Sequence, residues 1–359
     1  MKHKFKQVLS LALALCMVLS LASVNVFATT TGTAESTAAD TTEDTASSTS
    51  YAYSIVHLDN GRKYYSVDSI KTIIDNAAAA GFNYIELAVG NDGLRFLLDD
   101  MSLSFTVNGT EYSYTSEQVS SAIHTGNEAY YNETTDELTQ DEMDEIIAYA
   151  KTKGMGVIPC VNTPGHMDAI LYAGEALTGE TLSYYKSGRT IDVTNDLAVA
   201  FTQALLQKYI SYFADAGCTV FNMGADEYAN DVYTSGSMGF GALQSAGQYS
   251  YYVEYVNEVA ALVKEAGMTP MAFNDGIYFN NVTSSGTFDT DIMIAYWSSG
   301  WSGYTVASAS TLANMGFKMI NTHGDYYWVV GNSTWQCSAD KAAGFDYTSF
   351  QGGTISDPA

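Results

Sequence analysis

The chain has 359 residues, with 15 Lys and Arg against 40 Asp and Glu, and a formal net charge of −25 at pH 7. This acid excess excludes a general affinity for nucleic acid, because phosphate binding needs clustered Lys and Arg. Hydrophobic residues make up 47% and aromatic residues 13% of the chain, which excludes a wholly disordered protein.

The N-terminus has the pattern of an export signal. Lys2, Lys4 and Lys6 precede a mostly apolar run over 9–21, and the small residues Val26 and Ala28 suit a cleavage site. The run is too short to span a membrane comfortably. We therefore predict a signal peptide over 1–28, with an uncleaved anchor helix as the alternative. The mature chain should have no transmembrane segment and should be secreted or held at the cell surface.

Residues 29–50 contain only Thr, Ser, Ala, Asp, Glu and Gly. Such a segment buries little apolar surface, so we predict a disordered linker. The remainder, 51–359, is then a single domain of the size of an α/β barrel.

Three cysteines remain after export, namely Cys160, Cys218 and Cys337. The number is odd, and the first two lie in or beside strand-like runs, so we expect buried free thiols and no disulfide framework. No Cys and His pair has the spacing of metal ligands, so the sequence predicts no metal site and no cofactor.

From residue 51 onward, helical segments end in Gly and short apolar strands follow. The helix ends are at Gly81, Gly154, Gly217, Gly267 and Gly316, where Gly takes the left-handed conformation that terminates a helix. The predicted strands cover 53–58, 84–89, 155–161, 219–223, 270–274, 292–296 and 317–321. Ser66 and the Thr139 and Glu142 capping box start two helices, and the Asn108-Gly109 turn predicts a hairpin over 101–114.

Strands that alternate with helices imply parallel βαβ units. Seven strands fit either a doubly wound sheet or a (β/α)₈ barrel that lacks one unit. No G-x-G-x-x-G follows the first strand, which disfavours a dinucleotide-binding fold. In barrels the chemistry lies at the carboxyl ends of the strands.

Polar and aromatic residues follow every predicted strand. They are Asp59, Arg62, Asn91, Asp92, Arg95, Asn162, His166, Asp226, Glu227, Asn274, Asp275, Trp297, Trp301, His323, Asp325, Tyr326 and Tyr327. The adjacent Asp226 and Glu227 should repel each other, so that the pKa of one rises, as a general acid requires. The alternative is a helix N-terminus that carries stabilising acids.

Several segments resemble known motifs. Residues 221–227 resemble the strand-four motif of family 20 glycoside hydrolases, the β-N-acetylhexosaminidases, and 157–166 and 58–66 resemble their strand-three and strand-one motifs. Residues 91–96 and 273–278 are similar to one branch, the secreted, surface-attached exo-β-N-acetylglucosaminidases of Gram-positive bacteria. The resemblance runs in order from about residue 53 to 335.

For the fold, the resemblance implies an α/β protein with a (β/α)₈ TIM barrel. The family's separate N-terminal domain is absent, because the linker runs directly into the first strand. Residues 352–359 are too short for an eighth strand and a last helix. We therefore expect 51–359 to form a catalytic barrel that stops before the eighth βα unit.

For the chemistry, the resemblance implies substrate-assisted retaining hydrolysis, in which the 2-acetamido oxygen of the sugar attacks its own anomeric carbon. Glu227 is the implied acid and base, and Asp226 holds the acetamido N–H and stabilises an oxazolinium intermediate. Tyr327 binds the acetamido carbonyl oxygen. Arg62 grips the O3 and O4 hydroxyls, which makes the enzyme exo-acting. The other implied substrate-binding residues are Asn91 and His166 as a polar pair beside the acid, Trp297 as a pocket wall, and Asn274 and Asp275.

The expected substrates are glycans with terminal β-linked GlcNAc, with GalNAc as the alternative. Two other hypotheses remain: a truncated, non-catalytic barrel that binds sugar, and an endo-acting family 18-type chitinase, whose spaced acidic motif the sequence lacks. The linkage and the oligomeric state stay open.

Overall fold

The computed structural model describes residues 51–130, 136–327 and 338–359, so the predicted signal peptide and linker lie outside the described residues. Seven parallel strands form the main sheet, and their spatial order follows the chain. They are β1 (Ile55–Leu58), β2 (Tyr84–Asn91), β6 (Gly156–Thr163), β7 (Val220–Gly224), β10 (Thr269–Phe273), β11 (Met293–Tyr296) and β14 (Met319–Asn321). The short β3 (Gly93–Leu94) pairs antiparallel with β2.

All seven predicted strands are present, each within about two residues of its predicted bounds. A doubly wound sheet reverses its strand order at a switch point. The order here never reverses from β1 to β14, as in a barrel. The barrel prediction is therefore confirmed over the doubly wound alternative, and among the described strands β1 and β14 form the two edges.

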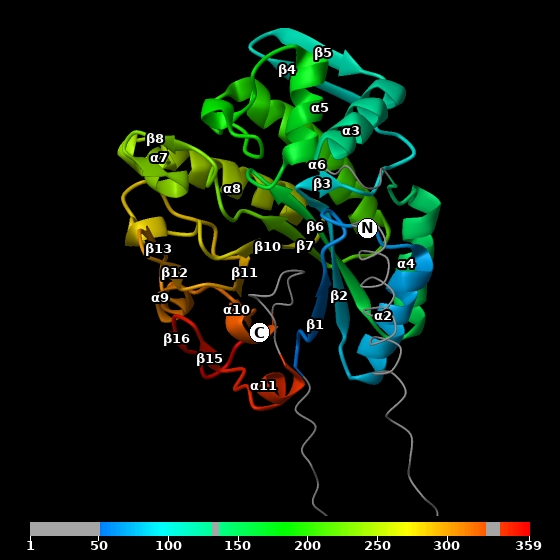
Figure 1. Ribbon diagram of the computed structural model, residues 1–359, viewed down its shortest axis with the longest axis vertical. Helices are drawn as coiled ribbons and strands as arrows, with labels where there is room; N and C mark the ends of the chain where they lie inside the picture. Colours follow the sequence, from blue (N-terminus) through cyan, green and yellow to red (C-terminus); the bar gives the residue numbers. More distant parts are fainter. Residues whose placement is uncertain (1–50, 131–135, 328–337) are drawn as a thin grey trace, which may run out of the picture. The chain divides into compact units, whose positions relative to one another are not determined.

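Helices follow the strands and pack outside them (Figure 1). They are α2 (Val67–Ala79), α3 (Ser116–Tyr130), α4 (Gln140–Thr152), α5 (Asp168–Thr178), η1 (Tyr184–Lys186), α6 (Asp196–Asp215), α7 (Gly239–Ser245), α8 (Tyr249–Glu265), η2 (Phe279–Asn281), α9 (Ala309–Asn314), α10 (Gly324–Tyr327) and α11 (Ala339–Ala343). None of the helices in the described ranges is long and apolar enough to cross a membrane.

The predicted helix ends are confirmed. Ser66 caps α2 by accepting the Ser69 N–H, and Thr139 with Glu142 forms the capping box of α4. The five glycines that end the predicted helices all have φ between 74° and 100°, a region that L side chains avoid. These local signals could be read correctly because they depend only on neighbouring residues.

Short hairpins extend from the barrel. The predicted hairpin forms from β4 (Leu103–Val107) and β5 (Thr110–Tyr114) at the top of Figure 1, and the Phe105 ring of β4 packs against Phe201 of α6. The other pairs are β8 (Tyr233–Thr234) with β9 (Ser237–Met238), β12 (Gly300–Trp301) with β13 (Tyr304–Thr305), and β15 (Ser349–Phe350) with β16 (Gly353–Thr354).

The curved sheet has apolar layers on both sides. A large core fills the space between strands and helices, and a smaller cluster lies on the inner face. That inner cluster contains Ile158, Val220, Met271, Phe273, Met293, Ala295 and Ile320. Cys160 and Cys218 are buried free thiols, as predicted, while Cys337 lies outside the described residues.

Candidate active site

The turn after β7 carries the two adjacent carboxylates. Gly224, Ala225 and Glu227 all have left-handed φ values, of 72°, 66° and 48°. Such values are rare for residues with a Cβ and concentrate at functional sites. A Cβ on Gly224 would lie 1.9 Å from Oδ1 of Asn162, so only Gly fits here.

Two buried side chains from other elements hold this turn. The hydroxyl of Tyr252 in α8 donates to the carbonyl oxygen of Ala225 at 2.5 Å. The Glu227 N–H donates to Oδ2 of Asp275 at 2.9 Å, and this oxygen also accepts from the hydroxyl of Tyr304 at 2.7 Å. The left-handed turn is therefore fixed from both the helix layer and the neighbouring strand end.

His166 lies between the two carboxylates. Its Nε2 is 3.1 Å from Oε2 of Glu227 and 3.6 Å from Oδ2 of Asp226, and its Nδ1 is 2.7 Å from Oδ1 of Asp92. Burial opposes the charged ring, but the surrounding carboxylates raise the pKa of His166 to about 10. The carboxylates on both sides of the ring therefore favour the imidazolium, in which both nitrogens donate, although the Arg62 guanidinium also lies 3.1 Å from Nδ1.

This charge acts to lower the pKa of both neighbouring carboxyl groups, but the outcome differs between them. Burial raises the pKa of Asp226, and the Glu227 charge adds to the rise. Burial also acts to raise the pKa of Glu227, but the hydrogen bond and charge of His166 outweigh it, and the pKa is lowered. The predicted rise of one pKa is present, but in this unliganded site it falls on Asp226 and not on the implied acid.

The side chains also differ in depth. Asp226 is 14% exposed and accepts an N–H from Asn162 at 2.7 Å, whereas Glu227 is 29% exposed. Glu227 is therefore the more accessible carboxylate, and Asp226 lies deeper. The first can meet a departing group from solvent, and the second can face charge that develops nearer the strands.

Arg62 lies on the other side of His166. Its Nε donates to Oδ2 of Asp92 at 2.7 Å and its Nη1 to Oδ2 of Asp59 at 3.2 Å. Burial opposes this charge, but the two carboxylates raise the pKa of Arg62 further above its ordinary value. The guanidinium is thus fixed in one orientation at the strand ends, with its side chain 36% exposed.

The expected pairing of His166 with Asn91 is wrong. Asn91 donates to Asp59 at 3.0 Å and accepts from Asn162 at 3.3 Å, and the partner of His166 is Asp92. Asp92 has a left-handed φ of 60°, which turns its side chain toward the imidazole. The sequence predicts Asp92 at a strand end, but no role for it.

Asn274 and Asp275 are fully buried behind the site. Asn274 Oδ1 accepts the Trp297 N–H at 2.9 Å, and its amide donates to the carbonyl oxygen of Ser298 at 2.8 Å. Asp275 accepts the Trp297 indole N–H at 3.1 Å. Both residues therefore position Trp297 and the carboxylate turn, and they do not lie on the surface that a sugar would meet.

The remaining predicted residue, Tyr327, ends α10, and its side chain lies outside the described part of the structure. Three supporting residues were missed as such: Asn162, Tyr252 and Tyr304. Asn162 stood at a strand end and offered a signal. The two tyrosines lie in the α8 helix and a β-hairpin, where the sequence has nothing to distinguish them from core aromatics.

His166, Asp226 and Glu227 are also close enough to enclose a cation, with ligand atoms all within 4.8 Å of one another. A metal ion would need the neutral imidazole lone pair. In the described structure both ring nitrogens of His166 contact carboxylates, Asp92 through Nδ1 and Glu227 through Nε2.

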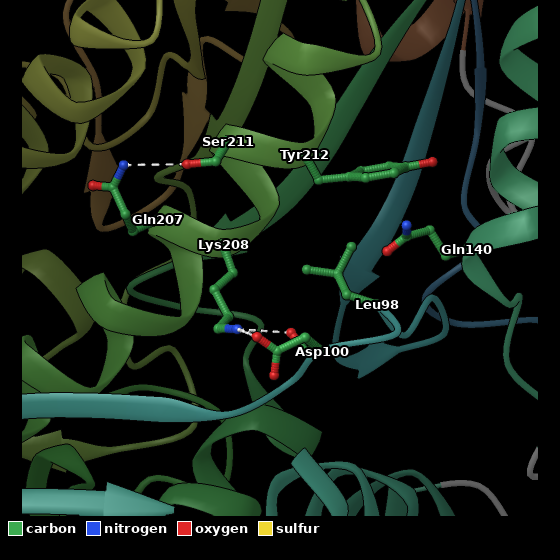
Figure 2. A pocket seen from close by; sticks show the side chains of 7 residues that line it. All are labelled: Leu98, Asp100, Gln140, Gln207, Lys208, Ser211 and Tyr212. Atoms are coloured by element: carbon green, nitrogen blue, oxygen red, sulfur yellow. Dashed lines mark hydrogen bonds and ion pairs between the residues drawn. The ribbon is translucent and has the colours of Figure 1, made fainter. Parts of the chain in front are cut away.

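A separate hollow lies over α6 (Figure 2). It is lined by Leu98, Asp100, Gln140, Gln207, Lys208, Ser211 and Tyr212. The Lys208 ammonium there is already paired with Asp100, at 2.8 Å. None of the strand-end carboxylates lines this hollow, so it is not the candidate active site.

Comparison with solved structures supports the same fold. A structure of the pneumococcal virulence factor StrH is 42% identical, with a TM-score of 0.74, over 81% of this chain and 71% of that chain. A catalytic module of the same pneumococcal exo-β-D-N-acetylglucosaminidase is 41% identical, with a TM-score of 0.77, over 84% and 73%. Dispersin B, at 22% identity and a TM-score of 0.60, shares the fold over 85% and 86%.

Among curated proteins, lacto-N-biosidase of Bifidobacterium bifidum is 26% identical over 198 residues, which is 53% of this chain and 17% of that protein. β-Hexosaminidase subunit A1 of Dictyostelium discoideum is 23% identical over 283 residues, which is 76% and 45%. The chain thus spans less than half the length of these relatives. The model of the glycosyl hydrolase family 20 catalytic domain matches residues 51–351. With the barrel and the Asp226 and Glu227 turn, this match places the chain in glycosyl hydrolase family 20.

Proposed function

We propose that the protein is a secreted, exo-acting β-N-acetylhexosaminidase that removes terminal β-linked GlcNAc from glycans. The observation that carries the proposal is the turn after β7, where Asp226 and Glu227 flank the buried imidazole of His166. A family 20 catalytic domain over residues 51–351 and the likeness to a pneumococcal exo-β-D-N-acetylglucosaminidase support it.

In the first step, the acetamido oxygen of the bound sugar attacks C1 as the glycosidic C–O bond breaks. Glu227 gives its proton to the departing oxygen. Asp226 accepts a hydrogen bond from the acetamido N–H and stabilises the positive oxazolinium ring. In the second step, water attacks C1, the ring opens to restore the acetamide, and Glu227 accepts the proton from water.

The first step needs a protonated Glu227, although the pKa of Glu227 is lowered in the free site. Substrate binding would raise this pKa. A sugar over the mouth would remove water from the exposed part of Glu227, and desolvation raises the pKa of a carboxyl group. Glu227 then takes up a proton from solvent. Binding would then turn Glu227 into the protonated acid that the first step needs.

Arg62 would hold the O3 and O4 hydroxyls of the terminal sugar. Asp59 and Asp92 fix its guanidinium group, whose planar N–H donors suit two neighbouring hydroxyls. Trp297 would line the acetamido pocket. Tyr327 would donate to the acetamido carbonyl oxygen, a role that rests on the sequence resemblance alone. The predicted export signal over 1–28 and the predicted linker over 29–50 support action outside the cell, which we propose takes place at the surface of a Gram-positive bacterium.

The test is hydrolysis of 4-nitrophenyl β-GlcNAc by the full chain, with the β-glucoside as the control substrate. We expect release from the N-acetyl substrate alone. Glu227→Gln should lower kcat by about 10²–10⁴-fold, the usual contribution of a general acid, without loss of the folded state. Normal turnover by Glu227→Gln, or equal hydrolysis of the glucoside, would contradict the proposal.

A further inference from the structure

A hairpin between β6 and β7 borders the candidate active site. Ser183 and Ile191 form an antiparallel bridge, and the Tyr184 N–H donates to the carbonyl oxygen of Thr190 at 3.0 Å. Tyr185 and Lys186 have left-handed φ values of 45° and 66°, and both side chains are exposed. We call residues 183–191 the rim hairpin.

The rim hairpin is fixed between the two catalytic loops. The N–H of Met167, the residue after His166, donates to the Arg189 carbonyl oxygen at 2.8 Å. The N–H of Ala229, two residues after Glu227, donates to the Thr190 hydroxyl at 3.0 Å. The backbone of the rim hairpin at Arg189 is therefore bonded to residues that lie one or two positions from His166 and Glu227.

Arg189 differs from the other two arginines of the chain. Arg62 is paired with two carboxylates, and Arg95 is buried and donates to backbone carbonyls. The Arg189 side chain is partly buried, yet among the described residues its guanidinium has no hydrogen bond or ion pair. This is unexpected in a chain with 40 acidic residues, since a desolvated charge is stable only when it is paired.

The charge of Arg189 still reaches the site. It acts to lower the pKa of Glu227, after the larger effects of burial, His166 and Arg62, and it opposes the rise in the pKa of Asp168 that burial causes. One carboxylate oxygen of Asp168 is itself buried without a hydrogen-bond partner among the described residues. Arg189 thus lies near both acids without being paired to either.

Lys186 on the same hairpin is a second exposed cation for which the described residues offer no partner. The described part of this short segment thus carries two cations without a paired carboxylate, although Asp231 accepts from the neighbouring Ser187 hydroxyl and Gly188 N–H. In the proposed function Glu227 protonates the departing oxygen, so we assign cations that lie near Glu227 to the side of the leaving sugar. The exposed ring of Tyr185, at 56%, offers an adjacent face for a sugar ring.

We propose that Arg189, assisted by Lys186, forms a leaving-group subsite that selects a carboxylate on the sugar next to the scissile bond. The planar fork of Arg matches a carboxylate in a bidentate manner, and the substrate then supplies the missing counter-charge. This inference rests on the proposed function, and it adds an acidic glycan as the preferred substrate class.

The test compares two disaccharides that differ only at C6 of the leaving sugar, GlcNAc-β1,4-glucuronate and GlcNAc-β1,4-glucose. The quantity measured is the ratio of their kcat/KM values. We expect wild type to favour the glucuronate. Arg189→Gln should lower the ratio about tenfold, the effect of losing one charge-assisted hydrogen bond, and Lys186→Gln should lower it less. Arg189→Lys should retain part of the preference.

Lys318→Gln is the matched control, because Lys318 is an exposed cation just before β14, at the opposite end of the strands from the site. A wild-type ratio near one, or a ratio that Arg189→Gln does not change, would overturn the inference. If Arg189 acts only on the acidity of Glu227, the variant moves the pH profiles of both disaccharides equally at a constant ratio, which also overturns it. Failure to hydrolyse 4-nitrophenyl β-GlcNAc would instead contradict the proposed function.

Discussion

The imidazole Nε2 of His166 lies 3.1 Å from Oε2 of Glu227, and this contact lowers the pKa of the implied acid. General-acid catalysis needs Glu227 protonated, so kcat/KM should fall as pH rises through its pKa. Replacing His166 with Gln removes the positive charge and raises that pKa. We therefore predict that His166→Gln moves the alkaline limb of the kcat/KM profile to higher pH, along with a fall in the maximum.

His124→Gln is the control for this prediction, because His124 contacts Glu137 and no residue of the site. Its pH profile should match wild type. An alkaline limb that stays in place or moves to lower pH in His166→Gln would show that the imidazolium does not control the acidity of Glu227.

The left-handed turn after β7 should tolerate no side chain at Gly224. Gly224→Ala adds a Cβ that would meet Oδ1 of Asn162 at 1.9 Å, and Asn162 holds Asp226. We predict near-complete loss of activity. Gly217→Ala provides the comparison, since Gly217 has a φ of 86° and open space around a Cβ.

Both glycine substitutions should lower the free energy of unfolding by about 1–2 kcal/mol through backbone strain. Only Gly224→Ala should also displace the carboxylates. The readouts are thermal unfolding and aryl-glycoside turnover for each variant. Similar activity in the two variants would mean that close packing against Asn162 does not determine the turn.

Tyr252 should stabilise the same turn from the helix layer. Tyr252→Phe leaves the buried Ala225 carbonyl oxygen without this donor, which should lower the free energy of unfolding by about 1–3 kcal/mol. We also expect a lower kcat, because the carboxylates then lose a fixed position. Tyr251→Phe, at the exposed neighbouring position, should change neither quantity. Equal effects at the two positions in a urea titration would refute this role.

The sequence predicted the fold well because the relevant signals are local. Ser66, Thr139 and the helix-ending glycines each act within one turn of chain, and each of the seven predicted strands is present. The strand ends then indicated the site, since parallel strands bring their carboxyl ends together.

What the sequence could not predict depends on tertiary contacts. Asp92 is the partner of His166 in place of Asn91 because the backbone of Asp92 is left-handed. The burial of Asn274 and Asp275 depends on the loops above them. The acidity of Glu227 depends on whether His166 is charged, which three surrounding carboxylates decide.

Some of the 27 tyrosines have a structural role that the composition alone does not show. Several buried tyrosines donate from the helix layer to loop carbonyls, as Tyr249 does to Gly276 and Tyr252 to Ala225. Their role is to fix the loops at the strand ends, and contact with sugar is not required to account for them.

The central claim is that the acetamido group of the substrate is the nucleophile at the Asp226 and Glu227 site. The most direct measurement compares kcat/KM for aryl β-glucosaminides that carry N-acetyl or N-trifluoroacetyl groups, in wild type and in Asp226→Asn. Fluorine withdraws electrons from the carbonyl oxygen, so the account predicts a steep fall in the wild-type rate, and a low rate in Asp226→Asn for both substrates. Equal wild-type rates, or a sugar trapped as an ester on either carboxylate, would contradict it.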